Sequence, residues 1–127
     1  MCLILHYKQN HKKIATEDIL CFKVVYPRHT KWYQRAQYIA EYWDFVYIKG
    51  KKYTLDRDLV SRRDSFSDNF VVNEGFHSYM YPPMNRPTGT QIVRCIIPKG
   101  SQIYIGHVNN SEIKGYVSNQ IIIKGKF

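Results

Sequence analysis

Cationic and aromatic side chains are interleaved in one short stretch of the chain. Between Arg28 and Arg35 the sequence reads Arg-His-Thr-Lys-Trp-Tyr-Gln-Arg, which gathers guanidinium, ammonium and indole groups. Aromatic rings stack on nucleobases, and arginine forms paired hydrogen bonds with phosphate. The stretch therefore predicts contacts to a nucleotide or a single strand through Arg28, Lys31, Trp32 and Tyr33. The alternative interpretation is the cationic surface of an amphipathic helix that binds no ligand.

Three further arginines occur where the sequence has no periodic apolar pattern. Arg62 and Arg63 lie in a highly charged stretch, and Arg86 lies in a proline-rich one. Both stretches are typical of exposed segments. Together with Arg28 and Lys31, these three side chains are expected to neutralise the phosphates of an anionic ligand.

A histidine follows a glycine and an aromatic residue in the segment Gly75-Phe76-His77-Ser78-Tyr79. The segment predicts that His77 and Ser78 hydrogen-bond the ribose or phosphate of a ligand and that Tyr79 stacks on its base. A second interpretation makes His77 a general acid or base of a small enzyme. A third is a strand edge at which the histidine bonds a backbone carbonyl.

Other catalytic and metal-binding patterns are incomplete. Cys2 would become an N-terminal nucleophile if Met1 were removed, as in amidotransferases that begin Met-Cys-Gly, but leucine follows it here and favours a buried strand cysteine. No two of the five histidines have the i, i+2 or i, i+4 spacing that presents metal ligands on one face. The turns at 49–52 and 98–100 lack the phosphate-loop pattern. We therefore expect no catalytic residue set, no metal and no cofactor.

The composition favours one domain with an anionic partner. The chain has 127 residues, the usual size of a single domain, here residues 1–127. A formal net charge of +9 favours nucleotides, nucleic acid or an acidic protein surface. The cysteines lie far apart in apolar runs, as expected of buried free thiols in a reducing compartment; they are Cys2, Cys21 and Cys95. No apolar run approaches the roughly 18 residues that span a bilayer, and the start lacks a signal-peptide pattern, so we expect a cytoplasmic protein without membrane contact.

Apolar and β-branched runs predict strands in the first half of the chain. The run Cys2–Tyr7 is short, whereas Ile19–Tyr26 is a strong strand candidate that Pro27 should end. The stretch Phe45–Leu55 predicts a hairpin with Gly50 near its tip.

A different periodicity predicts one helix near residues 30–43, with Thr30 as its N-cap. The apolar residues at helical spacing are Trp32, Ala36, Ile39 and Trp43. Beyond the hairpin, the charged stretch Asp56–Asn69 predicts a short exposed helix or a loop, and Tyr81–Gly89 predicts a loop because prolines and a glycine interrupt it.

The last third of the chain predicts a meander of three strands. These are Gln91–Ile97, Ser101–Ile105 and Tyr116–Lys124, bounded by turn residues. The expected fold class is therefore α+β, with a mainly antiparallel β-sheet that includes the C-terminal meander and one helix near residues 30–43.

Several segments carry a resemblance, in this order: Met1–Ile4, Lys13–Val25, Tyr47–Tyr53, Gly75–Tyr79, Arg94–Ser101 and Tyr116–Ile122. Through them the chain resembles a family of small bacteriophage and mobile-element proteins of gut bacteria, which implies no particular activity. Relatives place a helix after the Gly75–Tyr79 segment, where this chain has the proline-rich loop Pro82–Gly89. A phage setting implies, by analogy, a protein that inhibits host defence, such as the oligomeric sponges that sequester nucleotide second messengers.

We therefore expect a non-enzymatic homo-oligomer that binds and sequesters an anionic nucleotide-type ligand, of the cyclic oligonucleotide or cyclic ADP-ribose type. Three alternatives stay open at this point. They are a nucleic-acid-binding module, a small enzyme that acts on nucleotides with His77 as acid or base, and a protein that binds a host protein through Trp32–Tyr47.

Overall fold

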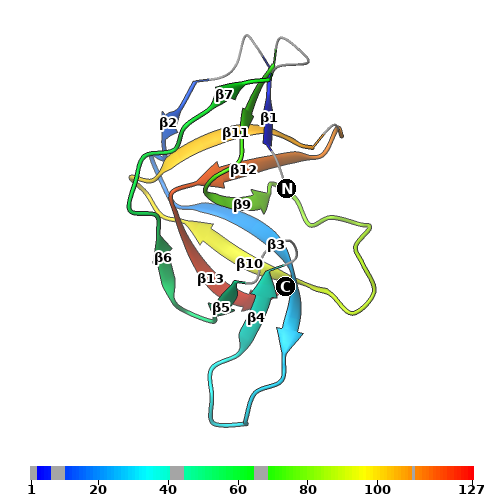
Figure 1. Ribbon diagram of the computed structural model, residues 1–127. Helices are drawn as coiled ribbons and strands as arrows, with labels where there is room; N and C mark the ends of the chain where they lie inside the picture. The colour runs from blue at the N-terminus through cyan, green and yellow to red at the C-terminus, as the bar shows by residue number, and fades with distance from the viewer. Residues whose placement is uncertain (1–2, 7–10, 41–44, 65–68, 110) are drawn as a thin grey trace.

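Antiparallel strands make up the computed structural model, which describes residues 3–6, 11–40, 45–64, 69–109 and 111–127. Within these residues the strands are β1 (Leu3–Leu5), β2 (Lys13–Ile14), β3 (Ile19–Arg28), β4 (Gln37–Ala40), β5 (Val46–Ile48), β6 (Lys52–Thr54), β7 (Arg62–Arg63), β8 (Phe70–Val72), β9 (Phe76–Tyr79), β10 (Gln91–Ile97), β11 (Gln102–Val108), β12 (Lys114–Ser118) and β13 (Gln120–Lys126). They form one sheet in the order β6-β13-β10-β3-β9-β12-β11-β1-β8-β7, with β2, β4 and β5 paired beside this path. Figure 1 shows β9, β11 and β12 in the upper half and β4, β5 and β6 in the lower half, with β3 running between them.

The prediction of a helix near residues 30–43 is wrong, and the described residues form an all-β fold and not an α+β fold. Residues 29–36 connect β3 to β4, and in β4 Tyr38 is buried whereas the other three residues are half-buried. The helical spacing misleads because Trp32, its first member, is 95% exposed and belongs to no buried face. Residues 41–43 of the predicted helix lie outside the described residues. The described part of the chain contains no helix long and apolar enough to cross a membrane.

The strand predicted at Ile19–Tyr26 is confirmed as part of β3, the longest strand. β10 pairs with one edge of β3 from Ile19 to Val25. The prediction that Pro27 ends this strand is wrong, because β3 continues to Arg28 in register with β4. Beyond Val25 the described strands cover only the edge of β3 that faces β4, and an uncovered edge tolerates a residue without an N–H.

The C-terminal third has strands near the predicted places but not the predicted meander. β10 and β11 are joined by a turn, yet β10 pairs with β3 and β13, whereas β11 pairs with β12, β1 and β2. The single strand predicted at Tyr116–Lys124 is divided at Asn119 into β12 and β13. The N–H of Asn119 donates to the carbonyl of Gln102 (3.2 Å), and the N–H of Gln102 donates to Oδ1 of Asn119 (2.8 Å). These two hydrogen bonds hold Asn119 against the start of β11. They mark the point where β12, which pairs with β11 and β9, gives way to β13, which pairs with β10 and β6.

The hairpin predicted at Phe45–Leu55 is wrong in its pairing, although both strands and the turn exist. Gly50 has a positive φ of 83° in the turn between β5 and β6. β5 pairs with β4, however, and β6 pairs with β13. The loop predicted at Tyr81–Gly89 is confirmed, and the charged stretch before β8 contains the short strand β7.

Buried apolar side chains from both halves of the chain fill the largest core cluster. It includes Cys21 and Val25 of β3, Cys95 of β10 and Ile121 of β13. Cys21 and Cys95 stand directly opposite each other in the β3–β10 ladder, and both are free, fully buried thiols. The prediction of buried free thiols is confirmed for these two residues, whereas Cys2 lies outside the described residues.

Gly106 of β11 allows β1 to pack closely against this strand. A Cβ at this position would lie 2.3 Å from the carbonyl oxygen of Ile4 and 3.0 Å from Cδ2 of Leu5. We expect Gly106→Ala to lower the free energy of unfolding by about 3 kcal/mol, because a backbone atom must move to admit the methyl group. Urea unfolding measures this change.

Gly100→Ala provides the control for Gly106→Ala. Gly100 has a positive φ of 88°, but a Cβ added there would meet nothing within 4 Å, so only backbone strain of about 1 to 2 kcal/mol applies. If Gly106→Ala lowers the free energy of unfolding no more than Gly100→Ala does, the close approach of β1 is contradicted.

Candidate functional site

β3 changes its neighbour halfway along one edge. Near the start of the strand Phe22 pairs with Tyr79 of β9, and from Val25 onward β3 pairs with β4. Lys23 and Val24 lie between these pairings, so β9 and β4 separate at this point, which we call the fork. A pocket of about 510 Å³ lies along the fork, a volume typical of small-ligand sites.

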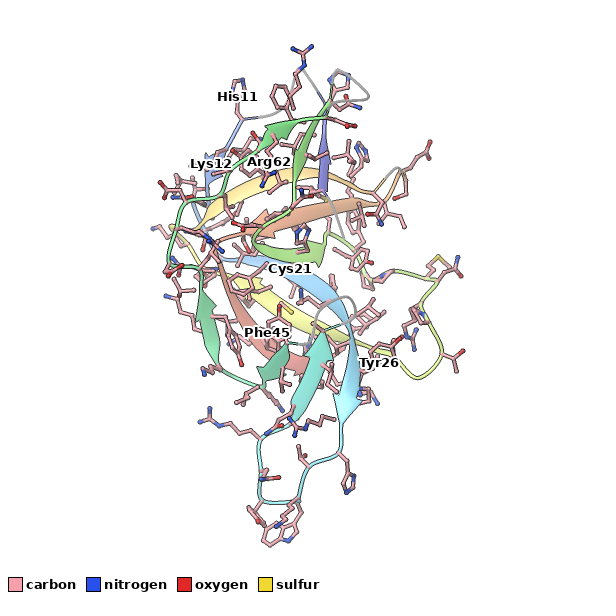
Figure 2. The ribbon with its side chains drawn as sticks, in the orientation of Figure 1. His11, Lys12, Cys21, Tyr26, Phe45 and Arg62 are labelled. Atoms are coloured by element: carbon pink, nitrogen blue, oxygen red, sulfur yellow. The ribbon has the colours of Figure 1, made fainter. Side chains whose placement is uncertain are left out.

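Aromatic side chains form one wall of the pocket. Phe45, Tyr47 of β5 and Phe76 of β9 line it. The ring centroids of Phe45 and Tyr47 are 4.7 Å apart, and those of Tyr47 and Tyr53 are 5.2 Å apart, in the edge-to-face arrangement that aromatic pairs favour. The hydroxyl of Tyr53 accepts the N–H of Ile48 (2.8 Å), which holds this ring in place. Phe45, labelled near the middle of the view in Figure 2, has a side chain that is 40% exposed and therefore accessible to a ligand.

Lys23 places an ammonium group at the pocket. The residue is only 9% exposed and stands in an otherwise apolar part of β3. Its Nζ donates a hydrogen bond to the carbonyl of His77 and lies 5.1 Å from the ring centroid of Tyr47. The lysine side chain thus connects β3 to β9 next to the position where the ladder between these strands stops.

His77 lines the pocket as a neutral imidazole at pH 7. Its Nε2 lies 2.9 Å from the carbonyl oxygen of Asn73. A carbonyl only accepts hydrogen bonds, so Nε2 carries the proton and Nδ1 is left as an acceptor. Burial is the main cause that lowers the pKa of His77 to about 4. The nearby charge of Lys23 acts in the same direction, whereas the hydrogen bond to Asn73 raises the pKa.

An ion pair crosses the rim of the pocket. Nε of Arg57, which follows β6, lies 3.2 Å from Oε2 of Glu74 in the β8–β9 connection, and both side chains are more than half exposed. Gly75 comes next with a positive φ of 128°, and a Cβ there would lie 2.4 Å from Cγ1 of Val117, so glycine is needed for this approach to β12. An exposed ion pair is weak, so Arg57 is available to an anion that reaches the rim.

The structure places two of the ten sequence-predicted ligand residues, His77 and Tyr79, on the pocket wall. Ser78, between them, is buried and does not line the pocket. It lies near the thiol of Cys21, whose pKa is lowered mainly by the neighbouring thiol of Cys95. Ser78 therefore belongs to the core around the cysteine pair.

The other seven predicted residues do not line the pocket, and each of them is exposed: Arg28, Lys31, Trp32, Tyr33, Arg62, Arg63 and Arg86. The first four occupy the end of β3 and the β3–β4 connection, which Figure 1 shows at the bottom of the molecule. Arg62 lies in the upper part of the view in Figure 2, with His11 and Lys12. Nε of Arg86 donates to the carbonyl of Thr90 within the proline-rich loop (3.3 Å). The structure thus separates these cations instead of gathering them around one ligand.

Lys23, Tyr47 and the rim ion pair are pocket residues that sequence reasoning missed. Lys23 carries a signal, because it is the one charged residue within the apolar run Ile19–Tyr26 and a buried charge needs partners. Tyr47 appears only as a strand residue in the sequence. Arg57 and Glu74 carry no signal, because their approach depends on which strands pair across the sheet.

The pocket combines polar groups that suit an anion with rings that suit a planar ligand. Lys23 and Arg57 supply positive charge, Nδ1 of His77 is left as an acceptor because Nε2 bonds Asn73, and the ring of Phe45 lines the pocket. In the described part of the chain, no three His, Cys, Asp or Glu side chains are grouped so that they could hold a metal ion.

Acidification should destabilise the protein through His77. The folded-state pKa of about 4 lies below the ordinary value of 6.5, so the unfolded chain binds more protons between these values. This contribution to stability is complete above pH 6.5 and is lost as the pH falls toward 4. Between pH 7 and pH 4.5, we expect the free energy of unfolding of the wild-type protein to fall by about 2 to 3 kcal/mol more than that of His77→Gln.

Urea unfolding at the two pH values measures this difference. The glutamine amide does not titrate and can still donate to the carbonyl of Asn73, so the comparison removes the contribution of the other acidic and basic groups. Equal losses in the two proteins would show that His77 titrates normally.

A comparison of the chain with protein-family models, curated proteins and solved structures finds no match.

Proposed function

We propose that this protein binds and sequesters an anionic nucleotide-type ligand in the pocket at the fork, without changing the ligand chemically. The observation that carries the proposal is the ammonium group of Lys23, which is almost buried in a pocket with aromatic walls. A small ligand with a planar ring and a negative charge complements both features.

The burial of Lys23 makes its charge effective. An anionic oxygen 4 Å from a unit positive charge gains roughly 4 kcal/mol at the effective dielectric constant near a protein surface, against about 1 kcal/mol in bulk water. Arg57 at the rim adds a second cation whose exposed partner, Glu74, a ligand can displace. Both charges favour phosphate over a neutral or cationic group.

The aromatic wall favours a nucleobase over a quaternary ammonium ligand. Aromatic pockets also bind organic cations, through attraction to the ring faces. Here the ammonium of Lys23 already lies 5.1 Å from the ring of Tyr47 and would repel a second cation. In our proposal Phe45 and Tyr79, which both line the pocket, contact the planar part of the ligand.

The state of His77 supports binding and not catalysis. A general acid or base works best with a pKa near the working pH, whereas the pKa of His77 is about 4. Its Nε2 is also engaged by the carbonyl of Asn73. In our proposal, Nδ1 of His77 accepts a hydrogen bond from a ribose hydroxyl or a base N–H.

We further propose a phage anti-defence role, in which the ligand is an immune second messenger of the cyclic oligonucleotide or cyclic ADP-ribose type. The two free buried thiols, Cys21 and Cys95, support a reducing compartment such as the host cytoplasm. We propose that the protein sequesters this ligand as a homo-oligomer. Native mass spectrometry of protein purified from cells reports subunit number and retained ligand together.

Isothermal titration calorimetry against cyclic oligonucleotides, cyclic ADP-ribose isomers and linear mononucleotides tests the proposal. We expect a dissociation constant below about 10 µM for at least one of these ligands. Lys23→Met should weaken that binding by about tenfold to a hundredfold, because a charge-assisted hydrogen bond is lost. Phe45→Ala should weaken it too, with less effect on folding, because Phe45 is partly exposed.

Lys52→Met is the matched control, because Lys52 is an exposed lysine of β6 outside the pocket. Thermal unfolding of each variant separates lost binding from lost structure. Failure of the whole panel to bind, or equal binding by Lys23→Met and Lys52→Met, would exclude the proposed site. If the bound ligand is chemically converted during a long incubation, the protein is an enzyme and the proposal of sequestration is wrong.

A further inference from the structure

The connection between β3 and β4, residues 29–36, forms an arm that extends from the body of the molecule (Figure 1). Trp32 is 95% exposed and Tyr33 is 62% exposed at this arm. A large aromatic side chain that packs against so little of its own protein gains little from burial in the folded chain. The arm is separate from the pocket, because none of its described residues lines that site.

A local turn fixes the conformation of the arm. The N–H of Gln34 donates to the carbonyl of Lys31 (2.9 Å), and the N–H of Lys31 donates to Oε1 of Gln34 (3.0 Å). The rings of Trp32 and Tyr33 meet edge to face, with centroids 5.7 Å apart and planes at 89°. Nζ of Lys31 lies 5.8 Å from the ring centroid of Tyr33. The turn and these ring contacts present the indole of Trp32 to solvent in a defined orientation.

The arm carries positive charge and no acidic residue. In the sequence, Arg28 at the end of β3 and His29, Lys31 and Arg35 of the arm flank the two aromatic residues, and no Asp or Glu occurs from 27 to 40. A partner that contacts Trp32 therefore meets three permanent cations within a few residues. The surface complements a polyanion that also offers flat rings.

We infer that the arm binds single-stranded nucleic acid, with Trp32 stacked on an unpaired base and Arg28, Lys31 and Arg35 at the flanking phosphates. This combination of stacking platform and cationic groups suits single strands, whose bases expose their faces. An anionic lipid surface is less suitable, because residues 28–35 include no aliphatic side chain to enter the acyl region. Duplex nucleic acid hides the faces of its bases, so it lacks the surface that Trp32 requires.

Fluorescence anisotropy with a labelled oligouridylate of about 12 nucleotides, within the usual site size of a single-strand binder, tests the inference. We expect Trp32→Ala to weaken binding by about tenfold and Trp32→Phe, which keeps a stacking ring, to weaken it much less. The plot of log affinity against log salt concentration has a negative slope. Arg35→Ala should make this slope shallower by about 0.7, as expected for the loss of one phosphate contact on a single strand. Both residues are exposed in the arm, so these variants leave the core intact.

Tyr81→Ala is the matched control for the aromatic change, because Tyr81 is 67% exposed in a different loop and should not affect binding. Lys52→Met, at an exposed lysine outside both the arm and the pocket, should also leave oligouridylate binding nearly unchanged. The inference is overturned if Trp32→Ala binds as well as Tyr81→Ala, or if a duplex of the same length binds as tightly as the single strand. Binding to vesicles of phosphatidylserine and phosphatidylcholine in the absence of oligouridylate binding would assign the arm to a membrane instead.

Discussion

The hydrogen bond from Lys23 to the carbonyl of His77 holds the sheet together at the place where its ladder is interrupted. β9 meets β3 through the single pairing of Phe22 with Tyr79, and β4 takes over from Val25 onward. A buried ammonium is costly unless it is paired or hydrogen-bonded, so the contact that satisfies Lys23 also stabilises the two sides of the fork. The change of strand partner and the charge in the pocket are therefore one structural feature.

β3 carries two positively charged features in different surroundings. Lys23 lies among aromatic rings, where water screens its charge poorly and only a ligand that fits the pocket can reach it. The cations of the arm lie in solvent, where salt weakens their attraction beyond about 10 Å at 0.1 M ionic strength. The pocket thus suits selective binding of a small molecule, whereas the arm suits binding of an extended chain with an affinity that depends on salt concentration.

The sequence predicts individual strands well because β-branched runs bounded by turn residues are local signals, as at Ile19–Tyr26 and Gln91–Ile97. It does not predict their pairing, because the neighbour of each strand is chosen by burial across the whole sheet. The helix predicted near residues 30–43 is wrong for a similar reason. The spacing from Trp32 onward matches a helical period, but Trp32 is exposed, so these residues do not form one buried face. In the site, the glycine-histidine segment identified His77 and Tyr79, but the wall opposite them depends on long-range packing.

Pro27 has a consequence for the behaviour of β3 as an exposed edge. Past Val25 the described strands leave one side of β3 uncovered, and an uncovered strand can pair with another chain. Pro27 offers no N–H to such a partner, and the adjacent Arg28 brings a charge that repels a second copy of the same segment. The strand can therefore extend into solvent and carry its aromatic tip without becoming a starting point for aggregation.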